Sequence, residues 1–201
     1  MAYERKDFWY RKAKQQGYRS RAAYKLIELD RRLKLFHPGC RVVDLGCAPG
    51  GWLQVASERV GTRGCVVGMD RLDVEPLGRQ TVHVLKGDVT DEQSTDRLLE
   101  LLRGRADVVL SDMAPDTSGV GFADHVRSVE LAETSFEIAA KVGRKGCWWV
   151  AKVFDGQSVG ELCQKLRNAG CSVRRLRLSS TRKGSRELYL AGRLERVSEG
   201  A

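Results

Sequence analysis

Short apolar runs alternate with longer amphipathic stretches along most of the chain. Seven apolar runs have the length and composition of strands, and they cover 41–45, 64–69, 81–86, 106–111, 146–153, 171–178 and 187–192. A helical segment precedes the first run, and four amphipathic stretches have the length of crossover helices: 51–60, 94–103, 124–142 and 158–169. This alternation predicts an α/β fold in which helices connect the strands.

The character of the strands predicts how they are arranged. The first five are continuous apolar runs, as expected when helices cover both faces of a parallel sheet. The last two are joined by the turn-rich "SSTRKGSR" with no helix between them, which predicts an antiparallel hairpin. We therefore expect a doubly wound, mostly parallel sheet of about seven strands, with helices on both faces and an antiparallel last strand.

Composition narrows the class of protein. The 201 residues are 42% hydrophobic and 30% charged, which predicts one folded domain over 1–201 rather than a disordered chain. No apolar run approaches the roughly 20 residues that span a bilayer, and the N-terminus lacks the apolar stretch of a signal peptide. The six cysteines form no C-x-x-C pair, and the three histidines lack metal-ligand spacing. We expect a cytoplasmic protein with reduced cysteines and no metal.

The net charge of +9 is unevenly distributed. Residues 1–36 carry eleven Lys or Arg against four Asp or Glu, and residues 173–186 carry six basic residues and no acid. Concentrated basic regions favour a polyanionic partner such as RNA, because neutralising phosphates releases counterions. The alternative interpretation is a basic surface that serves only solubility.

The segment "VVDLGCAPGGW" (42–52) predicts a strand, a glycine-rich turn and the start of a helix. Gly46, Gly50 and Gly51 allow the backbone to turn tightly and to approach a ligand closely. The spacing is not G-x-G-x-x-G, which disfavours a nicotinamide dinucleotide site. Asp44, inside the strand, would repel a pyrophosphate and suits a cationic ligand better.

Acidic residues stand at or near the ends of three successive strands, at Asp44, Asp70 and Asp88. In this architecture ligands bind outside the carboxyl ends of the strands, where Asp70 would accept both ribose hydroxyls of an adenosine. Asp88 would accept an exocyclic amine. Each acid alone would more often be a solvated loop residue or a helix cap than a ligand-binding group. Together they suit an adenosine attached to a positive centre, which describes S-adenosylmethionine.

Five motifs carry a resemblance to a known family. "YRSRAAYKLIELD", "DLGCAPGGW", "SDMAPDTSG" and "AKVFDG", with the late "SRELYL", resemble the FtsJ/RrmJ (RlmE) family of RNA 2′-O-ribose methyltransferases, from about Phe8 to Arg193. The resemblance implies a Rossmann-like class I methyltransferase fold, S-adenosylmethionine as methyl donor and a catalytic Lys-Asp-Lys-Glu tetrad. Carried over residue by residue, the tetrad is Lys25, Asp112, Lys152 and Glu187. We expect the donor to be bound by Asp44, Gly46, Pro49, Gly50, Gly51, Trp52, Asp70, Asp88 and Asp112.

The resemblance also implies the substrate. In bacterial members the target is a uridine of large-subunit (23S) ribosomal RNA, and "SDMAPDTSG" favours that type. We expect a monomer that contacts RNA, within the large ribosomal subunit, through the N-terminal element 1–36. The alternatives are a tRNA anticodon-loop methyltransferase, a small-molecule methyltransferase, and a non-catalytic RNA-binding ribosome assembly factor. The basic N-terminus argues against the small-molecule alternative and the intact tetrad against the assembly factor.

The tetrad has to activate a poor nucleophile. A ribose 2′-hydroxyl must lose its proton as the methyl group arrives, and a general base can take it. A lysine is a base only when neutral, whereas its ordinary pKa is about 10.4. Burial favours the neutral form and neighbouring carboxylates favour the charged form. Lys152 is therefore predicted as the central group, either as the base or as a cation that stabilises the developing oxyanion. Asp112 and Glu187 would orient it, and Lys25 would position the substrate.

Overall fold

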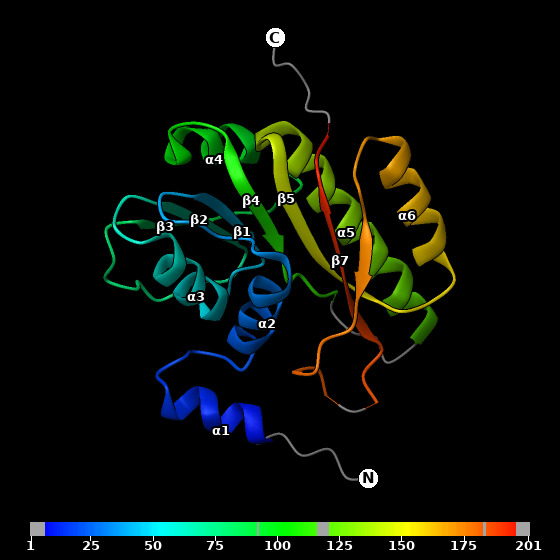
Figure 1. Ribbon diagram of the computed structural model, residues 1–201, viewed down its shortest axis with the longest axis horizontal. Helices are drawn as coiled ribbons and strands as arrows, with labels where there is room; N and C mark the ends of the chain where they lie inside the picture. Colours follow the sequence, from blue (N-terminus) through cyan, green and yellow to red (C-terminus); the bar gives the residue numbers. More distant parts are fainter. Residues whose placement is uncertain (1–6, 92, 116–120, 183, 196–201) are drawn as a thin grey trace.

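The computed structural model describes residues 7–91, 93–115, 121–182 and 184–195. Seven strands form one sheet in the order β3-β2-β1-β4-β5-β7-β6 (Figure 1). β1 to β5 are parallel, and β7 lies antiparallel between β5 and β6. The predicted fold class is therefore confirmed. The strands are β1 Arg41–Leu45, β2 Cys65–Asp70, β3 Val82–Lys86, β4 Ala106–Ser111, β5 Gly143–Phe154, β6 Arg174–Leu176 and β7 Glu187–Arg193.

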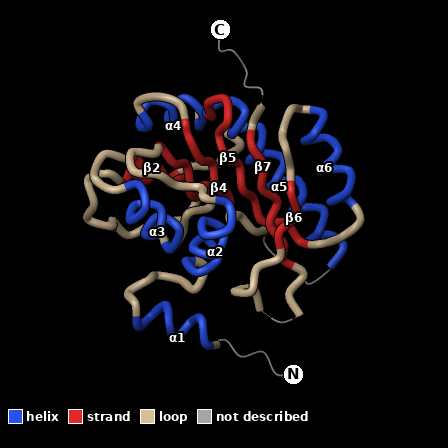
Figure 2. The backbone as a smooth tube through the Cα atoms, viewed as in Figure 1, coloured by secondary structure: helices blue, strands red, loops and turns tan. Residues whose placement is uncertain are grey.

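Six helices accompany the sheet: α1 Phe8–Gln15, α2 Ala23–Leu33, α3 Gly51–Val60, α4 Ser94–Leu102, α5 Gly121–Val142 and α6 Ser158–Asn168. Successive residues of a strand point to opposite faces of the sheet, so each strand contributes side chains to two hydrophobic cores. In β1, Val42 packs with Leu26 and Leu53 beneath α2 and α3, whereas Val43 belongs to the core beneath α4, α5 and α6. Figure 2 shows the sheet between these two helical layers. None of the described helices is both long and apolar enough to cross a membrane.

Two strands differ in length from the sequence prediction. The apolar run at 171–178 gives only the three-residue β6, preceded by an isolated bridge between Cys171 and Leu194. β6 is an edge strand, so only one side of it has a ladder to form, and short edge strands are common for that reason. β5 is longer than predicted and begins at Gly143 instead of residue 146. Its pairing with β4 is irregular between Gly143 and Trp148, where the strand carries exposed charged residues.

The antiparallel β7 places its first residues at the functional edge of the sheet. Parallel strands β1 to β5 end at that edge, whereas β7 begins there. The register between β5 and β7 pairs Lys152 with Tyr189 and Phe154 with Glu187. A residue late in the chain thereby joins residues that follow β1, β2, β3 and β4.

Candidate active site

Lys152 and Asp112 form a buried ion pair at the carboxyl ends of β5 and β4. The strands pair Ser111 with Ala151, so the next residue of each strand falls side by side. The Lys152 ammonium lies 3.1 Å from Asp112 Oδ1 and donates to the Asp112 backbone carbonyl at 2.5 Å. Lys152 is only 8% exposed, so its ammonium is held inside the protein rather than in solvent. This geometry favours a functional role over a solvated strand end.

A second ion pair brings α2 to the start of β7. The Lys25 ammonium lies 2.7 Å from one carboxylate oxygen of Glu187 and 2.9 Å from the other. Both side chains are largely buried. The four residues predicted as a tetrad therefore form two largely buried pairs, contributed by α2, β7, β5 and the end of β4.

Tyr189 connects the two pairs, and although it lies in the motif "SRELYL", only Glu187 of that motif was predicted to have a role. Its hydroxyl donates to Asp112 Oδ1 at 2.9 Å, and the Lys25 ammonium lies 5.9 Å from its ring centroid. Tyr189 is fully buried, and burial raises its pKa well above the usual value, so it remains a neutral donor. The available signal was its position two residues after Glu187, which puts both side chains on one face of a strand.

The charges around Asp112 keep it ionised. Burial raises the pKa of a carboxyl group, but the Lys152 and Lys25 ammonium groups and the Tyr189 hydroxyl outweigh that effect and lower the pKa of Asp112. The carboxylate thus holds Lys152 in a fixed position while its charge is compensated. An arrangement of this kind is costly to desolvate, and removing one partner would leave a buried charge uncompensated.

The glycine-rich turn lies beside these pairs, at the end of β1. Gly46 adopts φ +74°, and a Cβ there would meet the Met113 side chain at 2.6 Å, so the position requires glycine. The turn is held by Asp70, which accepts from the backbone N–H of Ala48 at 2.8 Å and of Leu72 at 2.9 Å. These two bonds leave the Asp70 carboxylate with further accepting capacity.

A cavity of about 590 Å³ opens between the turn and the strand ends. That volume lies in the range of small-molecule sites. Four of the predicted donor-binding residues line it, namely Gly46, Asp70, Asp88 and Asp112. Its other lining residues are Ala48, Met69, Arg71, Leu72, Gly87, Val89, Thr90, Met113, Ala114 and Leu131.

Asp88 is ready to act as an acceptor in this cavity. The backbone N–H and hydroxyl of Thr90 both donate to it, at 2.9 and 2.8 Å. These bonds lower the pKa of Asp88 against the smaller opposing effect of burial. Arg71 lies 3.9 Å from the same carboxylate.

Asp44 is the least satisfied group of the site. It is completely buried, and neither carboxylate oxygen has a hydrogen-bond partner among the residues that the structure describes. Burial, and then the charges of Asp112 and Asp70, raise its pKa well above the usual value. A positively charged ligand group near this carboxyl would relieve both effects. The site therefore fits the cationic donor that the acids predicted from the sequence.

Five predicted donor-binding residues do not line the cavity: the fully buried Asp44, and Pro49, Gly50, Gly51 and Trp52, which belong to the turn and the start of α3. Ala48–Pro49 is a cis peptide, and Gly50 has φ +107°. A Cβ on Gly51 would meet the Ser20 hydroxyl at 2.3 Å, so the turn packs closely on the segment before α2. Trp52 is 3% exposed and donates from its indole N–H to the Ala22 carbonyl at 2.8 Å, which places it in the core as a structural anchor.

The two basic regions of the sequence meet beside this edge of the sheet. Asp7, before α1, pairs with both Arg21 and Arg182. Glu28 of α2 accepts four hydrogen bonds from the backbone and hydroxyls of Ser179 and Ser180. Figure 1 shows α1 and the β6–β7 connection on the same side of the molecule as the strand ends. The two basic regions are therefore separate in the sequence but adjacent in the folded protein.

A cluster of His37, Cys40 and Asp107 was not evident from the sequence spacing, and its ligand atoms lie within 4.8 Å of one another. Its groups already have protein partners. Asp107 accepts from the Arg41 backbone N–H at 2.7 Å and from the Arg144 side chain at 2.5 Å. Burial raises the pKa of the Cys40 thiol, which disfavours the thiolate that a metal needs.

The fold and the site together define a Rossmann-like methyltransferase: a seven-stranded sheet with an antiparallel seventh strand and an acid-lined cavity at the strand ends. Residues 18–194 match the model of the FtsJ-like methyltransferases, and the chain belongs to this family. Ribosomal RNA large subunit methyltransferase E of Acidiphilium cryptum is 48% identical over 89% of this chain and 77% of its own. The protein of the same name from Methanothermobacter thermautotrophicus is 42% identical over 96% and 91%.

A solved structure supports the same fold. A Plasmodium falciparum protein assigned as a ribosomal RNA methyltransferase superposes with a TM-score of 0.77 and is 30% identical. The match covers 88% of this chain and 98% of that one. The resemblance inferred from the sequence motifs is therefore confirmed.

Proposed function

We propose that this protein transfers a methyl group from S-adenosylmethionine to the 2′-hydroxyl of a uridine in large-subunit (23S) ribosomal RNA. One observation carries the proposal: the buried Lys152–Asp112 pair, linked through Tyr189 to the Lys25–Glu187 pair, adjoins an acid-lined cavity. The names of the relatives, which are large-subunit ribosomal RNA methyltransferases, support the substrate.

The cavity residues suit the donor part by part. Asp70 and Asp88 offer carboxylate oxygens to ribose hydroxyls and to an adenine amine, as hydrogen-bond acceptors of adenosine should. Asp44, whose raised pKa favours the neutral acid in the free protein, would ionise beside a cationic methionine moiety and compensate its charge. When bound, the donor supplies an already activated methyl group, so the protein's task is to orient and deprotonate the acceptor.

Lys152 is the group that meets the acceptor hydroxyl. Its ammonium is fixed by the side chain and the backbone carbonyl of Asp112, both from the end of β4, and it does not depend on a flexible loop. As a base it would take the 2′-hydroxyl proton, and as a cation it would hold the forming oxyanion. Lys25, tied to Glu187, lies on the substrate-facing helix α2 and positions the ribose.

The converged basic surface would contact the RNA backbone. Residues 7–36 and the β6–β7 segment flank the strand ends, which places phosphate-binding groups around the proposed acceptor position. On α1, the Lys12 ammonium lies 5.4 Å from the Trp9 ring centroid and 5.0 Å from that of Tyr24. Exposed Phe8 and Tyr10 offer faces on which unpaired bases would stack.

The test compares three lysine variants on ribosomal RNA that lacks the modification. Lys152→Ala should lower the rate of methyl transfer by about 10²-fold or more, the scale of one lost base or oxyanion donor. Lys145→Ala is the matched control, because Lys145 lies in the same strand at its exposed opposite end. Transfer is measured with labelled donor, and the product nucleotide is mapped as a 2′-O-methyl group.

Lys152→Arg separates the two roles of the lysine. Arginine keeps the charge but cannot become neutral, so it cannot be a proton acceptor. Strong residual activity in this variant would assign oxyanion stabilisation, and loss equal to the alanine variant would assign the base. Near-normal turnover of Lys152→Ala, or methyl groups mapped to a base nitrogen or carbon, would contradict the proposed function.

A further inference from the structure

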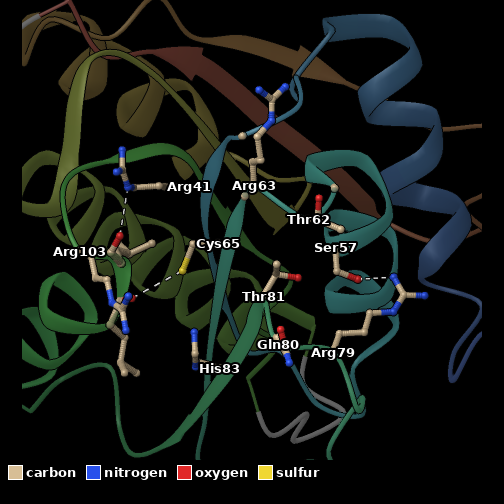
Figure 3. A pocket seen from close by; sticks show the side chains of 15 residues that line it. Arg41, Ser57, Thr62, Arg63, Cys65, Arg79, Gln80, Thr81, His83 and Arg103 are labelled. Carbon is tan, nitrogen blue, oxygen red and sulfur yellow. Dashed lines mark hydrogen bonds between the residues drawn. The ribbon is translucent and has the colours of Figure 1, made fainter.

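A second cavity lies at the opposite ends of the parallel strands from the candidate active site. It has a volume of about 710 Å³ and forms where β1, β2 and β3 begin, between the last turns of α3 and α4. We call it the arginine pocket, after Arg41, Arg63, Arg79 and Arg103. Figure 3 shows Arg41 and Arg103 on one side of it, Arg79 on the other, and Arg63 at its edge.

Positive charge dominates the arginine pocket. None of its fifteen lining residues is acidic. Arg79 is paired with Glu58 at 3.3 Å, but the Arg41 side chain donates, among the described residues, only to a backbone carbonyl. Among the described residues, Arg63 and Arg103 have no carboxylate partner, and both are exposed. Three guanidinium groups are therefore available to an anion, with the hydroxyls of Thr62 and Thr81 beside them.

The ends of two helices act against this charge without cancelling it. The carboxyl terminus of a helix carries about half a negative charge. Because α3 and α4 both end at the pocket, the opposing charge is about one unit against three uncompensated cations. One of the free carbonyls, that of Leu102, is already bound by Arg41 at 3.1 Å. The net potential stays positive.

The overall composition does not account for the pocket. Outside residues 1–36 and 173–186 the chain has 18 basic and 22 acidic residues, so this remaining part of the sequence has a net negative charge. Random placement in this part of the chain would mix the two signs. Four arginines around one acid-free cavity instead indicate a site for a strongly acidic group.

We propose that the arginine pocket binds a backbone phosphate of the RNA substrate, remote from the nucleotide that is methylated. The inference rests on the proposed function for the identity of the RNA. Strands of five or six residues separate the two edges of the sheet, a span of about 17–20 Å. A short oligonucleotide seated at Lys152 would not reach the pocket, whereas a long folded RNA that curves around the protein would. Guanidinium groups are well suited to phosphate because they bind it in a bidentate manner.

The experiment uses the full-length protein and measures RNA binding directly. Arg63→Ala/Arg103→Ala removes two exposed cations that make no hydrogen bond or ion pair among the described residues, so folding should be retained. Lys165→Ala/Arg167→Ala is the control of equal charge, since these residues are exposed on α6 at the far end of the sheet. Each protein is titrated with full-length large-subunit RNA and with a short oligonucleotide that carries the target nucleotide, over a series of salt concentrations.

For the long RNA we expect the arginine variant to bind about tenfold more weakly than the control, the lower end of what a charged hydrogen bond contributes. Its salt slope should fall by about 0.7–0.9, equivalent to one lost phosphate. Binding of the short RNA should be the same for all proteins. Equal slopes on the long RNA, or equal weakening on both RNAs, would overturn the proposal.

A free anion is the competing occupant of the pocket, and calorimetry with pyrophosphate tests it. Pyrophosphate that binds wild type, while the RNA affinities of variant and control agree, would assign the pocket to a free anion and overturn the RNA contact. Methyl transfer to the short RNA is followed in parallel and should be normal in the arginine variant. Absence of transfer by wild type to large ribosomal subunits that lack the modification would contradict the proposed function and leave the binding comparison intact.

Discussion

Replacing Asp44 by asparagine should make the free protein more stable and the methyl-donor complex weaker. The change keeps the size of the side chain and removes its charge. Asp44 is completely buried, and within the described part of the chain neither of its oxygens has a hydrogen-bond partner. Burial, followed by the Asp112 and Asp70 charges, raises its pKa well above the usual value. A side chain in this state destabilises the protein that carries it, unless a ligand compensates.

The size of the effect follows from that environment. An unsatisfied buried polar group costs about 1–3 kcal/mol, and a charged one costs more. Because the native pKa of Asp44 is raised, its folded state favours the bound proton. Wild-type stability therefore declines as pH rises from the unfolded pKa near 4 towards the native one, by up to about 1.4 kcal/mol per pH unit. At pH 8 we expect Asp44→Asn to be more stable by about 1–3 kcal/mol, or about 2–12 °C in Tm for a chain of this size.

The assay is urea or thermal unfolding at pH 5 and pH 8, together with calorimetry of S-adenosylmethionine binding. The stability gap should widen with pH, and donor affinity should fall about tenfold or more in the variant. Wild-type binding should release a proton, seen as a heat that varies with the ionisation enthalpy of the buffer. Asp73→Asn, at an exposed carboxylate 84% accessible, is the control and should show none of these effects.

A gap that does not change with pH, or a variant less stable than wild type at pH 8, would refute the account of Asp44 as an uncompensated buried acid. Unchanged donor affinity in a stabilised variant would keep that account but remove its functional reason.

Three other changes test separate parts of the site. Tyr189→Phe removes the hydroxyl that donates to Asp112, and the rate of methyl transfer should fall while the donor Kd, measured by calorimetry, stays within a fewfold; an unaltered rate would show that the link between the ion pairs is dispensable. Asp70→Ala should weaken donor binding about ten- to a hundredfold, since it removes both a ribose acceptor and the bond to the Ala48 N–H; unchanged affinity would remove the ribose assignment. Burial raises the pKa of Glu28, but four hydrogen bonds from the 179–180 turn outweigh it and lower that pKa, so its stabilising effect should be present above about pH 4.5 and lost as pH falls through the native pKa. Urea unfolding should therefore show Glu28→Gln to be about 1.5–3 kcal/mol less stable than wild type at pH 7, with a difference that shrinks towards pH 3; a constant difference would refute the linkage.

The sheet was predictable because each strand is a local signal. An apolar run followed by a glycine turn and an amphipathic stretch indicates a strand and its crossover helix, whichever strands it pairs with. The preference for right-handed crossovers then restricts the possible order of the strands in the sheet. The length of the edge strand β6 was overestimated. Residues 171–178 are apolar enough for a strand, but β6 pairs only with β7, and only Arg174–Leu176 form the strand. Length at an edge depends on the neighbour, which the local sequence does not contain.

The candidate site was predictable only where a motif carries it. The tetrad followed from the family resemblance, and the acids followed from their positions at strand ends. Tyr189 lies in the same motif as Glu187, but its role depends on the β5–β7 register that sets it opposite Lys152. The roles of Asp70 and Trp52 in holding the turn arise from contacts with Ala48 and Ala22, which depend on how loops fold back rather than on periodicity.

The late arrival of β7 has a consequence for synthesis on the ribosome. β7 is inserted between β5 and β6, so during translation β6 emerges without its only strand partner, and Glu187 reaches Lys25 across a sequence separation of 162 residues. Contacts this distant in sequence form late, because the chain between them must already be ordered. Until β7 docks, Lys25 lacks its counter-ion and Asp112 lacks the Tyr189 hydroxyl, so the proposed catalytic centre is not assembled. A protein proposed to modify ribosomal RNA would thus become active only after its own ribosome has synthesised β7.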